Sequence, residues 1–126
     1  MKTVLVTGAN GQLGQCIQKI HAQHSDINFH FVSSSELDIT NTQKVQELFS
    51  KHDFEYCVNC AAYTNVELAE SEADKAFLVN AEAVKHLAEA CVNHNTTLIH
   101  ISTDYVFDGN NTTPYVETDV TNTISV

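Results

Sequence analysis

The chain has little positive charge. Its 126 residues include 6 Lys plus Arg against 16 Asp plus Glu, which gives a formal net charge of −10 at pH 7. Nucleic acids and anionic membrane surfaces would be repelled by this charge, so we expect neither as a partner. A ligand that carries phosphate would have to be held by local dipoles.

Long apolar runs are also lacking. No stretch approaches the roughly 20 apolar residues that a membrane span needs, and the N-terminus has neither the basic start nor the cleavage site of a signal peptide. We therefore expect a cytoplasmic protein. Apolar residues make up 43% of the chain, which suffices for one core and little more, so residues 1–126 should form one domain or a part of one.

Cysteine is sparse and does not indicate a metal site. Of the four cysteines, Cys57 and Cys60 form the one CxxC pair. The pair lies in a predicted strand, where side chains three residues apart point to opposite faces. We therefore expect buried free thiols. The histidines have no metal-ligand spacing either, and we predict no metal site.

Strand-like and helix-like segments alternate along the chain. Short apolar, β-branched runs predict strands, and apolar residues at helical spacing predict helices, the second of them capped by Thr40 or Asn41. This order implies a parallel sheet with right-handed crossovers. We predict an α/β fold, a Rossmann-like doubly wound parallel sheet that is incomplete at the C-terminus. The strands are predicted at 2–7, 27–33, 55–62 and 96–103, and the helices at 11–24, 41–52 and 71–94.

Glycine is scarce as well, and three of the four glycines lie close together. Gly8, Gly11 and Gly14 follow the first predicted strand and open the first helix. Gly8 would allow a tight turn, Gly11 would leave room for a pyrophosphate at the helix N-terminus, and Gly14 would let the helix pack closely. The spacing GxxGxxG differs from the commoner GxGxxG, and an ordinary turn would explain one or two glycines. Three in this context predict a dinucleotide site.

The segment after the second strand bears on the choice of cofactor. An acidic residue there usually binds the ribose 2′-hydroxyl of NAD, but this chain has Ser33, Ser34 and Ser35, with no discriminating carboxylate and no arginine. Hydroxyls can serve either cofactor, and the serines could equally form a solvated loop. We predict NADPH or NADH, with weak discrimination between them.

Several motifs give the chain a resemblance to a known family. They are TGANGQLG, LDITN, NCAAYTNVELAESE, VNAEAVKHLAEAC and HISTDYVFDG, followed by PYVETD. In this order they resemble the dTDP-4-dehydrorhamnose reductases, members of the extended short-chain dehydrogenase/reductases. The resemblance implies an NAD(P)H-dependent oxidoreductase of polysaccharide biosynthesis. It would reduce dTDP-4-dehydro-rhamnose, a 4-keto-6-deoxy nucleotide sugar, to dTDP-L-rhamnose.

The resemblance also implies residue roles. Plainer alternatives stand beside them: Asp38 could cap the next helix, Thr103 could satisfy its own backbone, and Tyr63 could be an ordinary loop aromatic. In the family's pattern, Gly8, Gly11, Gln12 and Leu13 would hold the pyrophosphate, Asp38 and Ile39 would border the adenine, Ala62, Tyr63 and Thr64 would line the path to the nicotinamide, and Thr103 and Asp104 would contact the sugar, with Thr103 as the catalytic hydroxyl.

The pattern departs from the family at the end of the chain. The family's Tyr-x-x-x-Lys pair would follow directly after TNTISV, and Thr123 stands where proline is usual. The resemblance therefore implies that residues 1–126 are the N-terminal, NAD(P)-binding portion without the substrate domain, and that this chain alone is inactive. A homodimer of the full-length protein is compatible with it. The alternatives are a non-catalytic NADP-binding subunit, like the regulatory subunit of methionine adenosyltransferase, and an inactive fragment.

Overall fold

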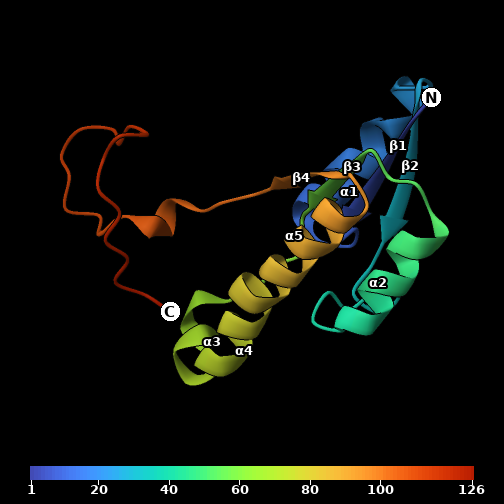
Figure 1. The fold of residues 1–126 in the computed structure, drawn as a ribbon. Coiled ribbons are helices and arrows are strands. Elements are labelled where there is room, and N and C mark those ends of the chain that lie inside the picture. The colour runs from blue at the N-terminus through green and yellow to red at the C-terminus, as the bar shows by residue number, and fades with distance from the viewer.

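The computed structural model describes residues 1–126, which form one parallel sheet with helices on both of its faces (Figure 1). Since β2 and β3 both pair with β1, on opposite sides of it, the strand order reverses between β1 and β3. This arrangement confirms the predicted Rossmann-like α/β fold. The sheet has the order β2-β1-β3-β4, with β1 at Lys2–Thr7, β2 at Ile27–Val32, β3 at Tyr56–Asn59 and β4 at Thr97–His100.

The helices follow the strands, as predicted. Asn41 caps α2, because its side-chain oxygen accepts a hydrogen bond from the backbone N–H of Lys44 at 3.0 Å. None of the helices has the length and apolar character that crossing a membrane would require. The helices are α1 (Gln12–Ile20), α2 (Thr42–Lys51), α3 (Val66–Ser71), α4 (Ala73–Phe77) and α5 (Ala83–Asn93), with 3₁₀ turns at His21–Gln23 and Asp104–Val106 and a π-helical turn at Leu78–Glu82.

The core lies between one face of the sheet and the helices α2 and α5. Leu5 of β1, Phe49 of α2 and Leu87 of α5 are at most 1% exposed and belong to one cluster of ten buried residues. Each such side chain stabilises the fold by about 1.5–3 kcal/mol. The connection through α1 runs from β1 to β2, whereas those through α2 and α5 run in the opposite direction along the sheet. Because such connections are right-handed, α1 lies on the other face. Helix α1 contributes nothing to this cluster, and Gly14 is its one buried residue.

Some predicted boundaries are wrong. Strand β3 ends at Asn59, because the chain turns there and the amide of Ala61 bonds back to the side-chain oxygen of Asn59. Strand β4 ends at His100, the partner of Asn59, because β3 offers no further backbone groups. Helix α1 ends at Ile20 and tightens into a 3₁₀ turn.

The helix predicted at 71–94 forms as α4, a π-helical turn and α5, which follow one another without a gap over residues 73–93. The short helix α3, which was not predicted, precedes it and is separated from α4 by a break at Glu72. Asn80 lies in the π-helical turn, where its side chain accepts from the N–H of Tyr63 at 2.8 Å and donates to the C=O of Tyr63 at 2.9 Å. Such turns accommodate one extra residue within a helix and often occur at functional sites. Here the turn ties the helix to the loop that follows β3.

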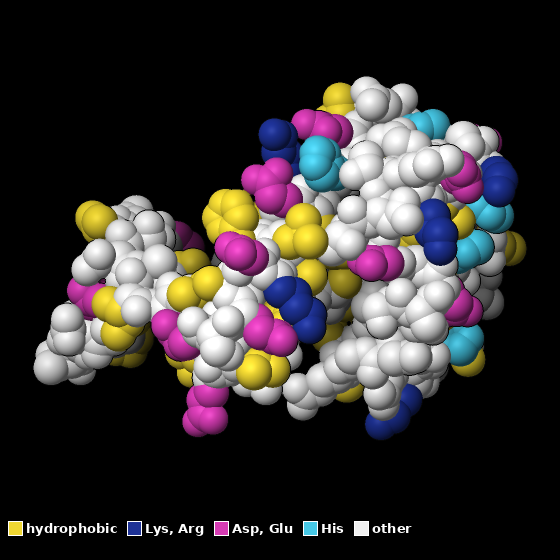
Figure 2. Space-filling model, turned by 90° about the horizontal axis from the view of Figure 1, so that it is seen from below, with side chains coloured by type: hydrophobic (Ala, Val, Ile, Leu, Met, Phe, Trp, Pro, Cys, Tyr) yellow, Lys and Arg dark blue, Asp and Glu magenta, His cyan; other side chains and the backbone are white.

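The segment 101–126 leaves the sheet after β4 and projects away from the helices (Figure 1). The rings of Phe107 and Tyr115 stack within it, with centroids 4.1 Å apart and an angle of 4°. Its last residue returns to α3, where the amide of Val126 donates to the carboxylate of Glu70 at 3.3 Å. The same segment forms the projecting lobe in Figure 2. That figure also shows acidic side chains spread over the whole visible face of the molecule.

Candidate functional site

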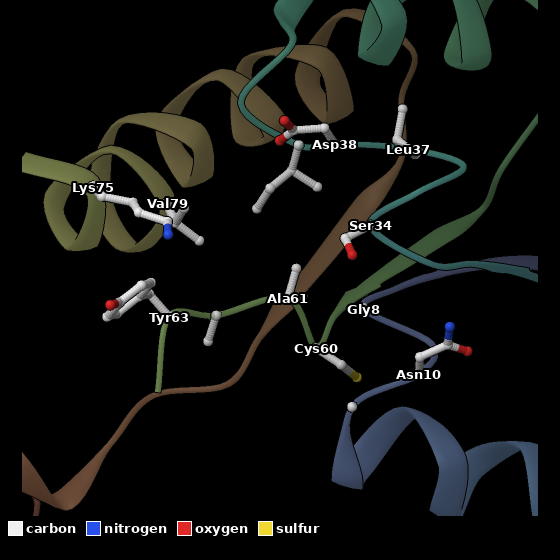
Figure 3. A pocket seen from close by; sticks show the side chains of 13 residues that line it. Gly8, Asn10, Ser34, Leu37, Asp38, Cys60, Ala61, Tyr63, Lys75 and Val79 are labelled. Atoms are coloured by element: carbon white, nitrogen blue, oxygen red, sulfur yellow. The ribbon is translucent and has the colours of Figure 1, made fainter. Parts of the chain in front are cut away.

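A cavity of about 410 Å³ opens at the carboxyl ends of β1, β2 and β3 (Figure 3). In open α/β sheets this edge, where the strand order reverses, is the usual place for a ligand. Each of the three strands contributes the loop that follows it, and the long helical segment closes the far side. The lining residues are Gly8, Asn10, Gly11, Ser34, Leu37, Asp38, Ile39, Cys60, Ala61, Ala62, Tyr63, Lys75 and Val79.

The three glycines of the first loop meet different surroundings. Gly8 has φ +64°, and a Cβ there would lie 2.5 Å from the backbone nitrogen of Ala61, so both its conformation and its packing require glycine. A Cβ on Gly14 would lie 2.5 Å from the C=O of Gly8, so α1 packs against the loop itself. A Cβ on Gly11 would lie 3.2 Å from the carbonyl oxygen of Gly8, a tight contact that a shift of a few tenths of an ångström in this oxygen would relieve. Gly11 also lines the cavity, so a side chain there would lie beside the ligand space.

The N-terminus of α1 presents free backbone amides beside Gly11. Gly11 is the N-cap residue and supplies no side-chain hydrogen bond, and the first intrahelical bond joins the N–H of Gln15 to the C=O of Gly11. The amides of Gln12, Leu13 and Gly14 are left without a partner in the protein. Together with the helix dipole they favour an anion at this end.

Asp38 and Ile39 form the wall that follows β2. A carboxylate oxygen of Asp38 accepts from the N–H of Thr40 at 2.9 Å and from its hydroxyl at 2.7 Å. Asp38 therefore shapes a turn ahead of α2, while Asn41 caps the helix. The side chain of Ile39 is 5% exposed and gives this wall an apolar surface.

The serine segment differs from its sequence interpretation. Ser33 is buried, and only Ser34 lines the cavity. The carboxylate of Glu36 folds back on Ser33, accepting from its N–H at 2.8 Å and from its hydroxyl at 2.7 Å. These bonds, the backbone one first, lower the pKa of Glu36. A carboxylate thus lies at the end of β2 after all, although it is not part of the cavity wall.

Tyr63 is held from two sides. Asn80 binds its backbone, and its hydroxyl donates to the carboxylate of Glu72 at 2.5 Å. This hydrogen bond raises the pKa of Tyr63 to about 12 and lowers that of Glu72. The ammonium of Lys75 lies 3.3 Å from the same carboxylate oxygen and 5.3 Å from the centroid of the Tyr63 ring. The phenol is therefore a neutral donor that braces the loop.

Thr103 and Asp104 lie outside this cavity. The Thr103 hydroxyl oxygen accepts from the N–H of Tyr105 at 3.2 Å, and the hydroxyl donates to the carboxylate of Asp104 at 3.4 Å. Asp104 lines a second cavity of about 410 Å³ in the C-terminal segment, together with Tyr105 and Asp108. The plainer alternative for Thr103, a hydroxyl that satisfies local backbone, therefore describes its contacts in this chain.

The structure thus brings together about half of the predicted site residues. Gly8, Gly11, Asp38, Ile39, Ala62 and Tyr63 line the first cavity, whereas Gln12, Leu13, Gly14 and Thr64 flank it. Sequence reasoning missed Lys75 and Val79, although their spacing of four residues on a helix put both on one face. It also assigned no role to Asn10, Leu37, Cys60 or Ala61.

The cysteines are all free. Cys57 and Cys91 are buried, and their mutual hydrogen bond together with burial raises the pKa of Cys57. The expectation of buried thiols is correct for Cys57, only partly correct for Cys60, which is half-buried, and wrong for Cys16, which is exposed. No group of three or more His, Cys, Asp or Glu side chains comes close enough to hold a metal ion.

A comparison with known families decides the relationship. The family model described as the RmlD substrate binding domain matches residues 1–126. The chain belongs to this family. Its resemblance to dTDP-4-dehydrorhamnose reductases is thereby confirmed. The dTDP-4-dehydrorhamnose reductase of Aggregatibacter actinomycetemcomitans is 40% identical over 126 residues, which are 100% of this chain and 43% of that protein.

Solved structures of the RmlD family have the same fold. The dTDP-4-dehydrorhamnose reductase of Clostridium acetobutylicum superposes with a TM-score of 0.93 at 39% identity, covering 98% of this chain and 44% of that one. The dTDP-4-dehydrorhamnose reductase of Bacillus anthracis, solved in complex with NADP, gives a TM-score of 0.92 at 34% identity, covering 99% and 45%. The chain therefore spans less than half the length of these RmlD relatives.

Proposed function

We propose that this chain is the NAD(P)-binding portion of a dTDP-4-dehydrorhamnose reductase. The observation that carries the proposal is the cavity at the strand-order reversal, with Gly11 in its wall and the free amides of α1 at the same end. A pyrophosphate fits the chemistry of this end, because it is an anion and needs a backbone without a Cβ in its way. The NADP complex of the Bacillus anthracis relative supports the same ligand.

The residue roles follow from the walls of the cavity. Gly8, Gly11, Gln12 and Leu13 would hold the pyrophosphate, with Gly14 keeping α1 close to the loop. Asp38 and Ile39 would border the adenine, opposite Val79 on the helical segment. Ala62, Tyr63 and Thr64 would line the path toward the nicotinamide. The ligand would be NADPH or NADH.

In the whole protein we propose reduction of a 4-keto-6-deoxy nucleotide sugar, dTDP-4-dehydro-rhamnose, in the cytoplasm. When bound, the reduced cofactor would supply a hydride to the carbonyl carbon of the sugar, and the tyrosine of the family's Tyr-x-x-x-Lys pair in the whole protein would give the proton that the resulting alkoxide needs. Thr103 would donate a hydrogen bond to the carbonyl oxygen, and Asp104 would contact the sugar. The Thr103 hydroxyl now bonds to the carboxylate of Asp104 and to the backbone N–H of Tyr105, so substrate would have to replace these contacts.

The test of this proposal is binding of dinucleotides to the 126-residue chain. The chain contains no Trp, so fluorescence of reduced nicotinamide can be followed without interference from the protein. We expect NADPH, NADH and ADP-ribose to bind with similar heats in calorimetry, because the cavity is built for the adenosine and pyrophosphate that all three share. Failure of all three to bind would overturn the proposal.

A further inference from the structure

Lys75 is the one cationic side chain among the residues that line the cavity. The other ionised group of the lining is the carboxylate of Asp38, and the chain as a whole carries a net charge of −10. A dinucleotide brings negative charge of its own on the pyrophosphate. The negative charge of this protein therefore repels such a ligand. The ammonium of Lys75 is the one side-chain group in the cavity wall that could balance the charge of the ligand.

The position of Lys75 is set by its neighbours. It lies in α4, one helical turn before Val79, and Figure 3 shows its side chain extending from the helix toward the space between Asp38 and Tyr63. Glu72 holds its ammonium at 3.3 Å, and the ring of Tyr63 lies beneath it at 5.3 Å. The loop at Tyr63 is in turn fastened by Asn80. The ammonium thus rests at the rim of a wall that is held in place.

The contact with Glu72 is weak enough to be exchanged. The side chains of Lys75 and Glu72 are 61% and 38% exposed, and ion pairs at such exposure are worth little because water screens them. Glu72 keeps a second partner in the hydroxyl of Tyr63 at 2.5 Å. Glu72 therefore remains hydrogen-bonded when Lys75 turns away toward a ligand.

We infer that Lys75 attracts the phosphate groups of the dinucleotide electrostatically, as the cationic group of the wall across the cavity from the N-terminus of α1 (Figure 3), and that Glu72 opposes it by competing for its ammonium. The inference rests on the proposed function and adds to it a residue outside the glycine loop. It makes the contribution of Lys75 grow with the negative charge of the ligand. NADPH carries one phosphate more than NADH, about −1.5 to −2 in charge near neutral pH, and adenosine carries none.

The experiment measures the dissociation constants of NADPH, NADH and adenosine for four chains at low and moderate salt. The chains are the unchanged protein, Lys75→Gln, Glu72→Gln and Lys85→Gln. Lys85 is an exposed residue of α5 outside the cavity, so the Lys85→Gln variant matches Lys75→Gln in net charge. Circular dichroism establishes that each variant is folded.

We expect Lys75→Gln to lower the affinity for NADPH by up to about fivefold, since an exposed charge pair contributes up to about that factor. The affinity for NADH should fall by less, and the affinity for adenosine should not change. The loss should shrink as salt is added. Glu72→Gln should strengthen the binding of NADPH. The new amide oxygen still accepts a hydrogen bond from Tyr63, but it carries no charge that competes for the ammonium of Lys75. Lys85→Gln should bind like the unchanged chain.

The outcomes separate this inference from the proposed function. If the unchanged chain binds no dinucleotide, the proposed function fails. If it binds them but Lys75→Gln and Lys85→Gln behave alike, only the role of Lys75 fails. An equal loss for adenosine and NADPH would also overturn the inference, because it would show that the stem of Lys75 acts by packing.

Discussion

Exchange of Gly11 for serine separates ligand binding from stability at the N-terminus of α1. Gly11 is the N-cap residue, with φ −71° and no side-chain cap, and serine is a good cap whose oxygen can accept from the amides of the first turn. The conformation suits any residue, but a Cβ would lie 3.2 Å from the carbonyl oxygen of Gly8, which must shift by a few tenths of an ångström to make room. The new cap contributes a few tenths of a kcal/mol, which offsets this crowding, so Gly11→Ser should leave the fold intact and its stability nearly unchanged.

The same change should weaken the binding of the dinucleotide. The new side chain would occupy the space proposed for the pyrophosphate and would take up an amide that is proposed to bond to it. A hydrogen bond to a charged group is worth about 1.5–3 kcal/mol, so we expect affinity for ADP-ribose to fall roughly ten- to hundredfold. Calorimetry measures the affinity, and thermal unfolding followed by circular dichroism measures the stability.

Two controls complete this design. Gly11→Val places a side chain in the same space but is a poor cap, so it should lose affinity and also some stability. Adenosine, which has no phosphate, should bind all three chains equally. If Gly11→Ser bound ADP-ribose as tightly as the unchanged chain, the pyrophosphate would not lie at the end of α1, and the roles given to this loop would be wrong.

Three further predictions follow from single residues. Gly8→Ala and Gly109→Ala both put a side chain at positive φ, but of the two only Gly8 has backbone atoms within 4 Å of the new Cβ. Chemical denaturation should show that Gly109→Ala lowers the free energy of unfolding by about 1–2 kcal/mol and that Gly8→Ala lowers it by more. Equal losses of stability would contradict this. Hydrogen bonds, first from the backbone amide of Asn110, lower the pKa of Asp108, so their stabilisation should be present above about pH 4 and lost as the pH falls through that lowered pKa. The Asn110 amide signal in NMR reports this, and Asp108→Asn should abolish the transition. Exposed Cys16 should react with a thiol reagent before the other cysteines, and Cys16→Ser should remove this fast phase.

Features of the chain that depend on near neighbours could be read from the sequence. The strands begin where predicted to within a residue, because β-branched apolar runs bounded by polar turns define them. The cap at Asn41 and the glycine turn are likewise local, since each depends on residues within three or four positions. The parallel order followed from the alternation of strands and helices.

Features that depend on distant contacts could not be read in this way. The π-helical turn exists together with the contact of Asn80 to Tyr63, seventeen positions away. Lys75 joins the cavity because α4 packs beside the Tyr63 loop. No periodicity or motif in the sequence encodes these contacts directly. The carboxylate of Glu36 is a different case, because it bonds to Ser33 only three positions away and sequence reasoning overlooked it.

The order of the strands has a consequence for synthesis of the chain on the ribosome. β1 is made first, yet it becomes the inner strand of the sheet, with Lys2 paired to Ile27 and Val4 paired to Tyr56. Both edges of this apolar strand therefore stay unpaired until β2 and β3 have been synthesised. Non-local pairing of this kind is slow and exposes nascent chains to misassociation. We expect the newborn chain to engage chaperones until β3 has left the exit tunnel, and a circular permutant that begins at β2 to shorten that interval.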